Sequence, residues 1–285
     1  MNGKAKFRKN MRVFMSRGVL SVICVIYVFV FLIMAVFAPV LTKYGPTEQI
    51  GKRLEKPSWE HLFGTDELGR DVFSRILYGA RVSFVASLLS SLVGLVLGTV
   101  LGLLAGYFKG IVSSVIMRFT DAILSIPALI LTMVLALLFR KGGVLSVGVV
   151  IGIAIMPGYI RVIYGLVLGM KENDFVIAAQ LIGQNRRSIL VRHFLPNCFP
   201  SLIVMFTMTL GTAISLEAAL SFLGVGITPP TPAWGSMVSD GYKWLIMKPS
   251  LAIIPGIFVL LTVVSFNVVG DGVRDVLDPR LKGKL

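Results

Sequence analysis

Six long stretches of apolar residues constrain this chain more strongly than any other feature of its sequence. A helix needs roughly 20 mostly apolar residues to cross a hydrocarbon core about 30 Å thick. Stretches of that kind without a charged residue lie at 18–42, 82–108, 122–139, 142–160, 194–216 and 249–270. The third can begin at residue 111, the fourth can continue to 170 and the fifth to 223. We therefore expect an all-α, polytopic membrane protein with six transmembrane helices.

The composition excludes an ordinary soluble enzyme. Hydrophobic residues make up 55% of the chain and charged residues only 15%, whereas a soluble domain carries roughly 25% charged residues. The sequence has no H-E-x-x-H or G-x-S-x-G motif of a membrane-embedded enzyme and no phosphate-binding loop of an ATPase. We therefore expect no catalytic residues and no cofactor. The first apolar stretch is longer than the core of a signal peptide, so we expect it to remain in the protein as a membrane helix.

The basic residues indicate which way the chain crosses the membrane. The 28 Lys and Arg against 14 Asp and Glu give a formal charge of +14. Basic residues collect on the cytoplasmic side of membrane proteins, and the arm before the first stretch is basic without an acidic residue. We expect a cytoplasmic arm at 1–18, the first transmembrane helix at 19–41 and an extracytoplasmic segment at 42–80. Six spans then place both termini in the cytoplasm, and the positive charge reflects this orientation and not nucleic-acid binding.

The loop at 171–193 has the clearest pattern between the spans. It contains apolar and small residues at i, i+3, i+4 and i+7, which is the spacing of one helical face. These residues are Phe175, Ala178, Ala179 and Ile182. Asn173 or Asp174 can cap the start of this helix, and Gly183 can end it in a left-handed turn.

A second short helix is expected after this glycine bend, at 187–194. It should end before Pro196, because proline cannot continue a helix. Exposed Ala178 and Ala179 would let the groove of a partner protein accept the first helix. An interfacial helix that lies on the bilayer is the alternative interpretation.

Four ionisable residues lie within or beside the apolar stretches, where a charge costs about 2.5–3.5 kcal/mol at mid-membrane on insertion scales. Arg118 and Asp121 are three residues apart, so we expect them to satisfy each other on one helical face. Arg161 and Glu217 are candidates for a water-filled path or for pairing across a subunit interface. Asp121, Arg161 and Glu217 are therefore the candidates for the translocation path or the interior.

Glycine recurs at every fourth position of the second stretch, which predicts a narrow strip for close packing of helices. The four residues are Gly94, Gly98, Gly102 and Gly106. In the segment before this stretch, Asp66, Arg70 and Asp71 are expected to form a hydrogen-bonded turn, because no nucleophile accompanies them.

The histidines and the aromatic residues of the last outer loop predict structural roles. His61 and His193 are far apart and have no partner at metal-ligand spacing, so we expect no metal site. Trp234, Tyr242 and Trp244 lie near the outer boundary and predict an aromatic belt at the membrane surface. Contact with a substrate-delivering protein is the second interpretation of these aromatic residues.

Four segments of the chain resemble the permeases of ABC importers. The pattern AA-x₃-G, followed by an apolar stretch and LP, resembles the loop that docks into the ATPase subunit in that family. FGTDELGRDVFSRILYGARVS at 63–83, LEAALSFLGVGITPPTPAWG at 216–235 and GDGVRDVLDPRL at 270–281 are similar to the C-type subunit of the dipeptide, oligopeptide and nickel subfamily.

This resemblance implies the type I importer permease fold. The permease core would occupy 81–272, with five helices and a coupling loop at 171–196, and a cytoplasmic tail would follow at 273–285. The residues that would couple to the ATPase are Ala178, Ala179, Gly183, Leu195 and Pro196.

The resemblance also implies a function and a set of partners. A permease of this kind forms half of an ATP-driven pore for di- and oligopeptides in the plasma membrane of a prokaryote. Its partners are a second permease subunit, two ABC ATPase subunits and an extracytoplasmic solute-binding protein. Import of nickel or a metal chelate is the alternative function. An ATP-independent channel or ion-coupled transporter is a more distant one, since the two halves of the chain show no repeat.

One position departs from the pattern of the family. Ile177 stands directly before Ala178, where the family usually carries a glutamate. A polar contact from that glutamate to the ATPase therefore cannot form in this chain. Docking through the shape of the helix at Ala178, Ala179 and Gly183 would remain.

Overall fold

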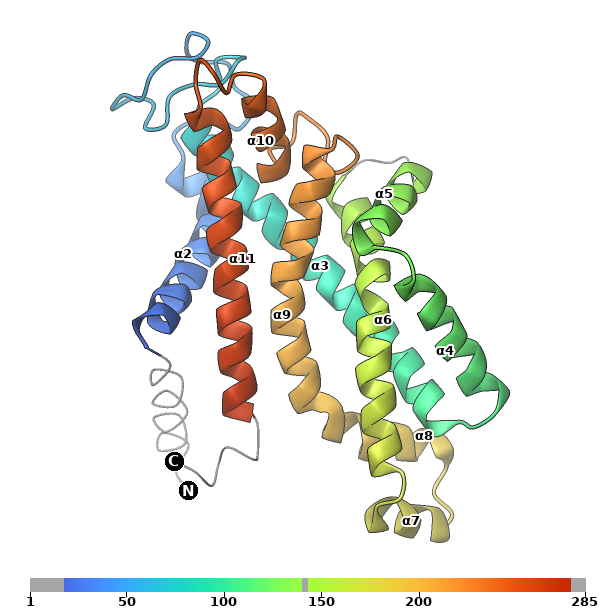
Figure 1. Ribbon diagram of the computed structural model, residues 1–285. Helices are drawn as coiled ribbons and strands as arrows, with labels where there is room; N and C mark the ends of the chain where they lie inside the picture. Colours follow the sequence, from blue (N-terminus) through green and yellow to red (C-terminus); the bar gives the residue numbers. More distant parts are fainter. Residues whose placement is uncertain (1–17, 140–142, 278–285) are drawn as a thin grey trace.

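The chain folds into a bundle of long helices. The computed structural model describes residues 18–139 and 143–277, and in these ranges the extended segments form only two isolated bridges and no β-strand. Figure 1 shows α10 at one end of the bundle and α7 at the other, and we refer to these as the α10 end and the α7 end. The elements are α2 (Val19–Leu41), α3 (Val72–Tyr107), α4 (Ile111–Leu124), α5 (Ala128–Phe139), α6 (Val144–Met170), α7 (Asp174–Leu181), α8 (Arg186–Ile189), the π-helix η1 (Leu190–Phe194), α9 (Leu195–Phe222), α10 (Trp234–Tyr242) and α11 (Ser250–Leu277).

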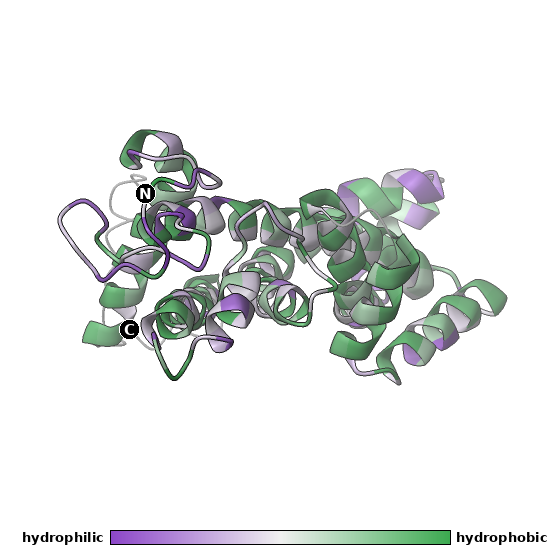
Figure 2. Ribbon diagram, turned by 90° about the horizontal axis from the view of Figure 1, so that it is seen from above, coloured by the Kyte–Doolittle hydropathy of each residue, from purple (hydrophilic) through white to green (hydrophobic). Residues whose placement is uncertain are grey.

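The long helices match the expected membrane spans. Among the described residues, five helices are long and apolar enough to cross a membrane, and the bent pair α4 and α5 is a sixth candidate. Figure 2 shows that the helices are mostly hydrophobic, while much of the hydrophilic colour lies in the connecting loops. This confirms the all-α membrane fold. Most of the basic arm at 1–18 and the last eight residues of the tail at 273–285 lie outside the described residues.

Helix α3 begins at Val72, ten residues before the second apolar stretch. Asp71 caps it by accepting a hydrogen bond from the Ser74 amide at 2.7 Å. The Asp71 carboxylate also lies 3.0 Å from Nδ1 of His61. Arg75, in the first turn, is buried and donates to the carbonyl of Pro46 at 3.0 Å. Because these first turns are polar and held by the preceding loop, hydropathy alone does not mark where the helix begins.

The third expected span is broken into two helices. Helices α4 and α5 meet at 97° across the residues 125–127. Pro127 explains the break, since it lacks a backbone N–H and disfavours the helical conformation at Ile126 before it. The third expected span, at 122–139 with a possible start at 111, is therefore bent, and hydropathy did not indicate the bend because it is high on both sides.

Glycines bring α3 and α6 into close contact along most of their length. A Cβ at Gly98 would lie 2.4 Å from Cβ of Tyr159, and one at Gly102 would lie 2.7 Å from Cβ of Ile163. From the other side, a Cβ at Gly152 of α6 would lie 2.6 Å from Cβ of Val93. Side chains of each helix thus occupy the space left by glycines of the other, which confirms the predicted packing strip.

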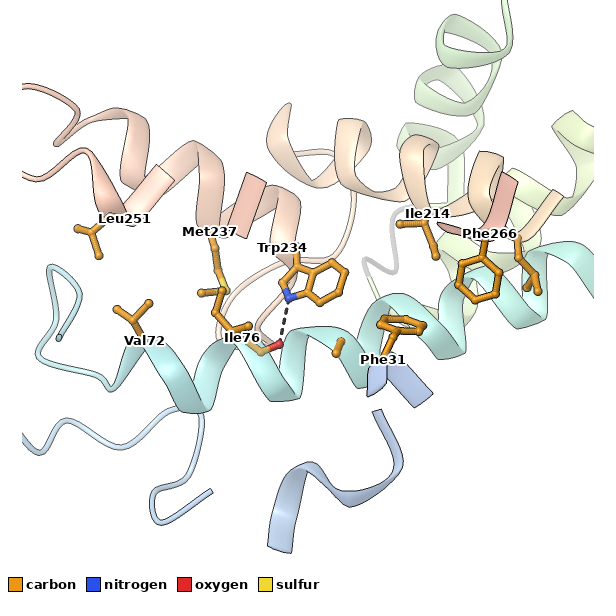
Figure 3. Close-up of a cluster of buried hydrophobic side chains, with 10 residues drawn as sticks. Phe31, Val72, Ile76, Ile214, Trp234, Met237, Leu251 and Phe266 are labelled. Atoms are coloured by element: carbon orange, nitrogen blue, oxygen red, sulfur yellow. Dashed lines mark hydrogen bonds between the residues drawn. The ribbon is translucent and has the colours of Figure 1, made fainter. Parts of the chain in front are cut away.

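At the α10 end, Trp234 anchors a large hydrophobic cluster. Its side chain is fully buried between α3 and the C-terminal helices, and its indole nitrogen donates to the carbonyl of Ile76 at 3.0 Å (Figure 3). Phe31 of α2 and Phe266 of α11 pack in the same cluster. Trp234 therefore belongs to the core, and its assignment to an aromatic belt at the membrane surface was wrong.

Candidate functional site

Helix α7 is a short helix of eight residues at one end of the bundle. It follows Asn173, whose side chain forms no capping hydrogen bond, and it ends at a left-handed Gly183 with φ of +76°. The amide of Gly183 donates to Gln180 O and that of Gln184 to Ala179 O, both at 3.0 Å. A residue with a Cβ would be strained at this φ, so the predicted role of Gly183 in ending the helix is confirmed.

One side of α7 is packed against the rest of the protein. Val176 is fully buried and Ala179 is only 3% exposed, in a cluster with Ile189 and Phe194. The expectation that Ala179 is exposed was wrong, because the short helix folds back over the η1 segment. Leu195 also packs against this cluster, whereas Pro196 is exposed.

The opposite side of α7 is apolar and open. Leu181 is 82% exposed, Ile182 74% and Ile177 44%, and Ala178 is exposed between them. We call these four residues the outer face of α7. The helical spacing predicted Ala178 and Ile182 on one face, but it did not indicate that Ile177 and Leu181 are surface residues. The signal was present, since a helix of eight residues cannot bury apolar side chains in every direction.

Polar contacts fix the bend after α7. His193 of η1 contacts Gln184 Oε1 through Nε2 at 2.9 Å, and its ring lies 6.2 Å from that of Phe175. Asn185 caps α8 by accepting from the amide of Arg187 at 3.3 Å. These contacts tie the residues after the glycine bend to the helix that follows.

The second short helix does not stop before Pro196. Helix α8 passes through the π-helix η1 into α9, so that the helical backbone runs from Arg186 to Phe222. Pro196 lies in the first turn of α9, where a missing N–H is tolerated, and the widened hydrogen-bond pattern of η1 accommodates the transition. The prediction of a helix end was wrong for this reason.

Glu217 lies in the packed interior of the bundle and not on an open surface. Its side chain is fully buried on α9. Ser83 of α3 donates to one carboxyl oxygen at 2.9 Å and Ser221 donates to the other at 2.8 Å. Ser221 also accepts from the amide of Ile227 at 3.1 Å. Glu217 thereby links α3, α9 and the loop that leads to α10.

Asp121 and Arg161 form an ion pair between α4 and α6. The guanidinium of Arg161 donates to the Asp121 carboxylate at 2.7 Å, and both side chains are more than half exposed in the single chain. The expected pair of Arg118 with Asp121 is therefore wrong, because Arg161 reaches the same carboxylate from the neighbouring helix. The three candidates for the path or interior do not form one cluster, since Glu217 is hydrogen-bonded to Ser83 and Ser221 and to neither residue of this pair.

The acidic and basic residues before α3 form the expected hydrogen-bonded turn. Asp66 accepts from the amides of Leu68 and Arg70 and from the Arg70 guanidinium at 2.6 Å. Trp244 joins this region by donating to Glu67 at 2.7 Å. The turn therefore connects the segment before α3 with the loop after α10, and it is a structural element.

Lys248, in the loop before α11, also stabilises the segment before α3. Its ammonium group donates to the carbonyls of Glu55 and Thr65. Burial lowers the pKa of Lys248, and the charges of Glu55 and Asp66 partly oppose this shift.

The described residues contain no group of three or more His, Cys, Asp or Glu side chains placed to hold a metal ion. The two cysteines, Cys24 and Cys198, are free and buried. The arrangement therefore presents an exposed apolar helix at the α7 end, a braced loop at the α10 end, and packed spans between them.

Comparison with known proteins assigns the chain to a family. A family model described as "Binding-protein-dependent transport system inner membrane component" matches residues 98–283. The glutathione transport system permease protein GsiD of Salmonella paratyphi A is 40% identical over 259 residues, which cover 90% of this chain and 85% of that protein. GsiD of Shigella flexneri serotype 5b is 38% identical over 260 residues, which cover 90% and 86% of the two chains.

Solved structures agree on the fold. A chain of the MetNI methionine ABC transporter in an inward facing conformation matches with a TM-score of 0.57 and 19% identity, covering 71% of this chain and 96% of that one. A second crystal form of that transporter matches with the same TM-score and covers 72% and 97%. The protein is a transport component and not an enzyme, and its family implies an ATPase, a solute-binding protein and a second permease as partners. The chain belongs to the permease subunits of binding-protein-dependent ABC importers.

Proposed function

We propose that this chain forms half of a pore that imports di- or oligopeptides, and that a separate ATPase drives it through the outer face of α7. The substrate class is supported by relatives that are named for transport of glutathione, which is a tripeptide. A second, different permease would complete the pore, two ATPase subunits would bind at the α7 end, and a solute-binding protein would deliver the peptide at the α10 end.

The exposed outer face of α7 is the observation that carries the proposed coupling. Leu181 and Ile182 are among the most exposed large apolar residues of the described chain outside its long helices. Burying such a side chain contributes about 1.5–3 kcal/mol. The packed inner residues, Val176 and Ala179, hold the helix firmly while the outer ones remain open to a partner.

Ile177 determines the chemistry of the proposed contact. It is 44% exposed and lies one turn before Leu181, so the two side chains share a face. An isoleucine there can only contribute apolar contact. We therefore infer that the ATPase presents an apolar groove to this helix. In relatives with a glutamate at the position of Ile177, the ATPase would instead present a polar partner for that carboxylate.

We also propose that the α7 end and both termini face the cytoplasm. The loop around α7 carries Lys171, Arg186, Arg187 and Arg192. The charges at the N-terminal arm have the same sign, and basic residues collect on the cytoplasmic side. An ATPase that uses cytoplasmic ATP would then meet α7 directly.

Substitution of the outer face tests this function. Ile177→Asp and Leu181→Asp each place a charge in an apolar contact, so we expect at least tenfold weaker ATPase association and a matching loss of peptide uptake. Ile246→Asp is the matched control for ATPase association, because Ile246 is fully exposed at the α10 end, opposite α7. Co-purification from membranes and uptake of labelled dipeptide measure the two effects.

A cross-link separates docking from the bilayer alternative. A photoreactive group on Leu181→Cys should capture the ATPase in native membranes. Capture of lipid alone, or normal ATPase association in both aspartate variants, would contradict the proposal.

A further inference from the structure

An open cavity of about 470 Å³ lies beside α7, between the ends of three long helices. Its wall is formed by the last turn of α3, the first turn of α4 and the last turns of α6. The polar side chains in this wall are those of Lys109, Ser113, Ser114, Tyr164, Lys171 and Glu172, together with Gln180 of α7. None of the four residues of the outer face of α7 lines this cavity.

Two lysines give the cavity its chemistry. Lys171 donates to the carbonyls of Tyr107 at 2.6 Å and Gly106 at 3.4 Å, which holds its ammonium group at the rim. Burial lowers the pKa of Lys171, and the positive charge of Lys109 lowers it further. Lys109 and Lys171 both line the cavity and repel each other, and Glu172 is the one acidic residue among those that line it. An anion between the lysines would relieve this repulsion.

The surroundings of the cavity are apolar. Ile111 is 82% exposed at the start of α4, and Val115 and Leu168 are exposed beside it. These side chains belong to helices that run on into the membrane-spanning part of the bundle. A ligand that fits both features has an anionic head and hydrocarbon chains.

We propose that this cavity binds the phosphate headgroup of an anionic phospholipid, with the acyl chains lying along the exposed apolar side chains of α4 and α6. Basic pockets between membrane helices bind such headgroups. The two lysines would contact the phosphate oxygens, and the hydroxyls of Ser113 and Ser114 would donate to them. Gly110, which precedes α4, provides no side chain to cap the first amides of that helix, so these amides remain available to the same phosphate. Lipid binding in this cavity requires only that the chain spans a membrane, and it does not depend on how α7 binds its ATPase.

Binding of fluorescent phosphatidylglycerol to the purified full-length chain in detergent tests the proposal. Lys109→Gln should weaken this binding about fivefold, the effect of one basic residue at an anionic lipid surface. Lys171→Gln should weaken it by at least as much, and Lys171→Arg should retain it because the charge remains. Lys56→Gln is the control, since Lys56 is an exposed lysine of the loop before α3, at the α10 end, and carries the same charge.

Competition experiments identify the ligand. We expect unlabelled phosphatidylglycerol to compete, and phosphatidylcholine or inorganic phosphate to compete only at far higher concentration. Equal competition by inorganic phosphate would mean a soluble anion site and would overturn the proposal. So would equal loss in the Lys56 and Lys109 variants, or a Lys109→Gln variant that binds lipid normally but loses its ATPase.

Discussion

Glu217 shows how a single carboxyl group is accommodated inside a membrane bundle. Both of its oxygens accept hydrogen bonds from serine hydroxyls, one on α3 and one on its own helix. A buried polar group without a partner costs about 1–3 kcal/mol. The hydrogen bonds therefore explain why a carboxyl group is retained where an apolar residue would otherwise fit.

This network predicts different results for two substitutions of Glu217. Glu217→Gln should leave the thermal stability of the full-length protein in detergent nearly unchanged, because the amide can accept from one serine and donate to the other. Glu217→Leu should lower the free energy of unfolding by about 1–3 kcal/mol, since the Ser83 hydroxyl loses its buried partner. If the glutamine variant were as unstable as the leucine variant, hydrogen bonding would not be the role of this residue.

Asp121 and Arg161 allow a test by charge exchange. Asp121→Arg or Arg161→Asp alone places two like charges side by side in membrane helices, where one unpaired charge costs up to about 2.5–3.5 kcal/mol. We expect either single variant to lose most uptake and much of its membrane level. The double exchange should restore both, because it recreates the ion pair.

The pair of Asp240 and Lys243 provides the control for this exchange. It lies at the α10 end, with N and O atoms 3.0 Å apart and the lysine well exposed. Exposed pairs contribute little, so reversing one of these charges should leave the membrane level of the protein unchanged. Failure of the Asp121 and Arg161 double variant to recover would show that the pair has a further role beyond mutual neutralisation.

The contact of α3 with α6 depends on glycines, which have no side chain to hold the two helices apart. We expect Gly98→Ala to destabilise the protein by about 1–3 kcal/mol, the usual cost of overpacking. The new Cβ would lie 2.4 Å from Cβ of Tyr159 and 2.8 Å from the carbonyl of Met156. Thermal unfolding in detergent measures the change.

Gly165→Ala is the matched control on α6. No atom lies within 4 Å of a Cβ at that position. Alanine is favoured over glycine in a helix by about 1 kcal/mol, so this variant should be as stable as the parent or more so. Equal stability of the two variants would mean that α3 and α6 are not held at the distance described.

The helices themselves could be predicted from hydropathy, and their interruptions could not. An apolar stretch of the right length has few alternatives in a bilayer, because every backbone group must be hydrogen-bonded within the segment. The bend at Pro127 and the continuous helix from α8 through η1 into α9 depend on which neighbouring groups form hydrogen bonds with single backbone N–H and C=O groups. The effect of proline was predicted wrongly at both places. Pro127 separates α4 from α5 where no break was expected, and Pro196 follows η1 without ending the helix, although an end was expected there.

The candidate site was only partly predictable for a related reason. Periodicity located α7 and its glycine end, and both depend on local sequence. Which side of α7 is buried depends on the η1 segment beneath it, which periodicity does not report. Ala179, which was expected to contact a partner, is therefore buried in the structure, and Ile177 and Leu181 are exposed.

Across the whole bundle, polar contacts hold the loops at the α10 end, while the spans below them rely on close packing. The loop before α3 is held by Asp66, Arg70 and Lys248, and the loop after α9 by Ser221. Peptide delivered at the α10 end would therefore meet a firm surface, and movement during transport would have to occur between packed helices.

The connections of α7 are very short. Three residues, 171–173, join it to α6, and four, 182–185, separate it from a helical backbone of 37 residues that reaches the opposite end of the bundle. At about 1.5 Å per residue, the path along that backbone is roughly 55 Å long, and it bends where α8 leads into α9 (Figure 1). Because both connections are this short, a displacement of α7 would also displace the adjoining ends of α6 and of this helical backbone, and the linking residues would absorb little of it.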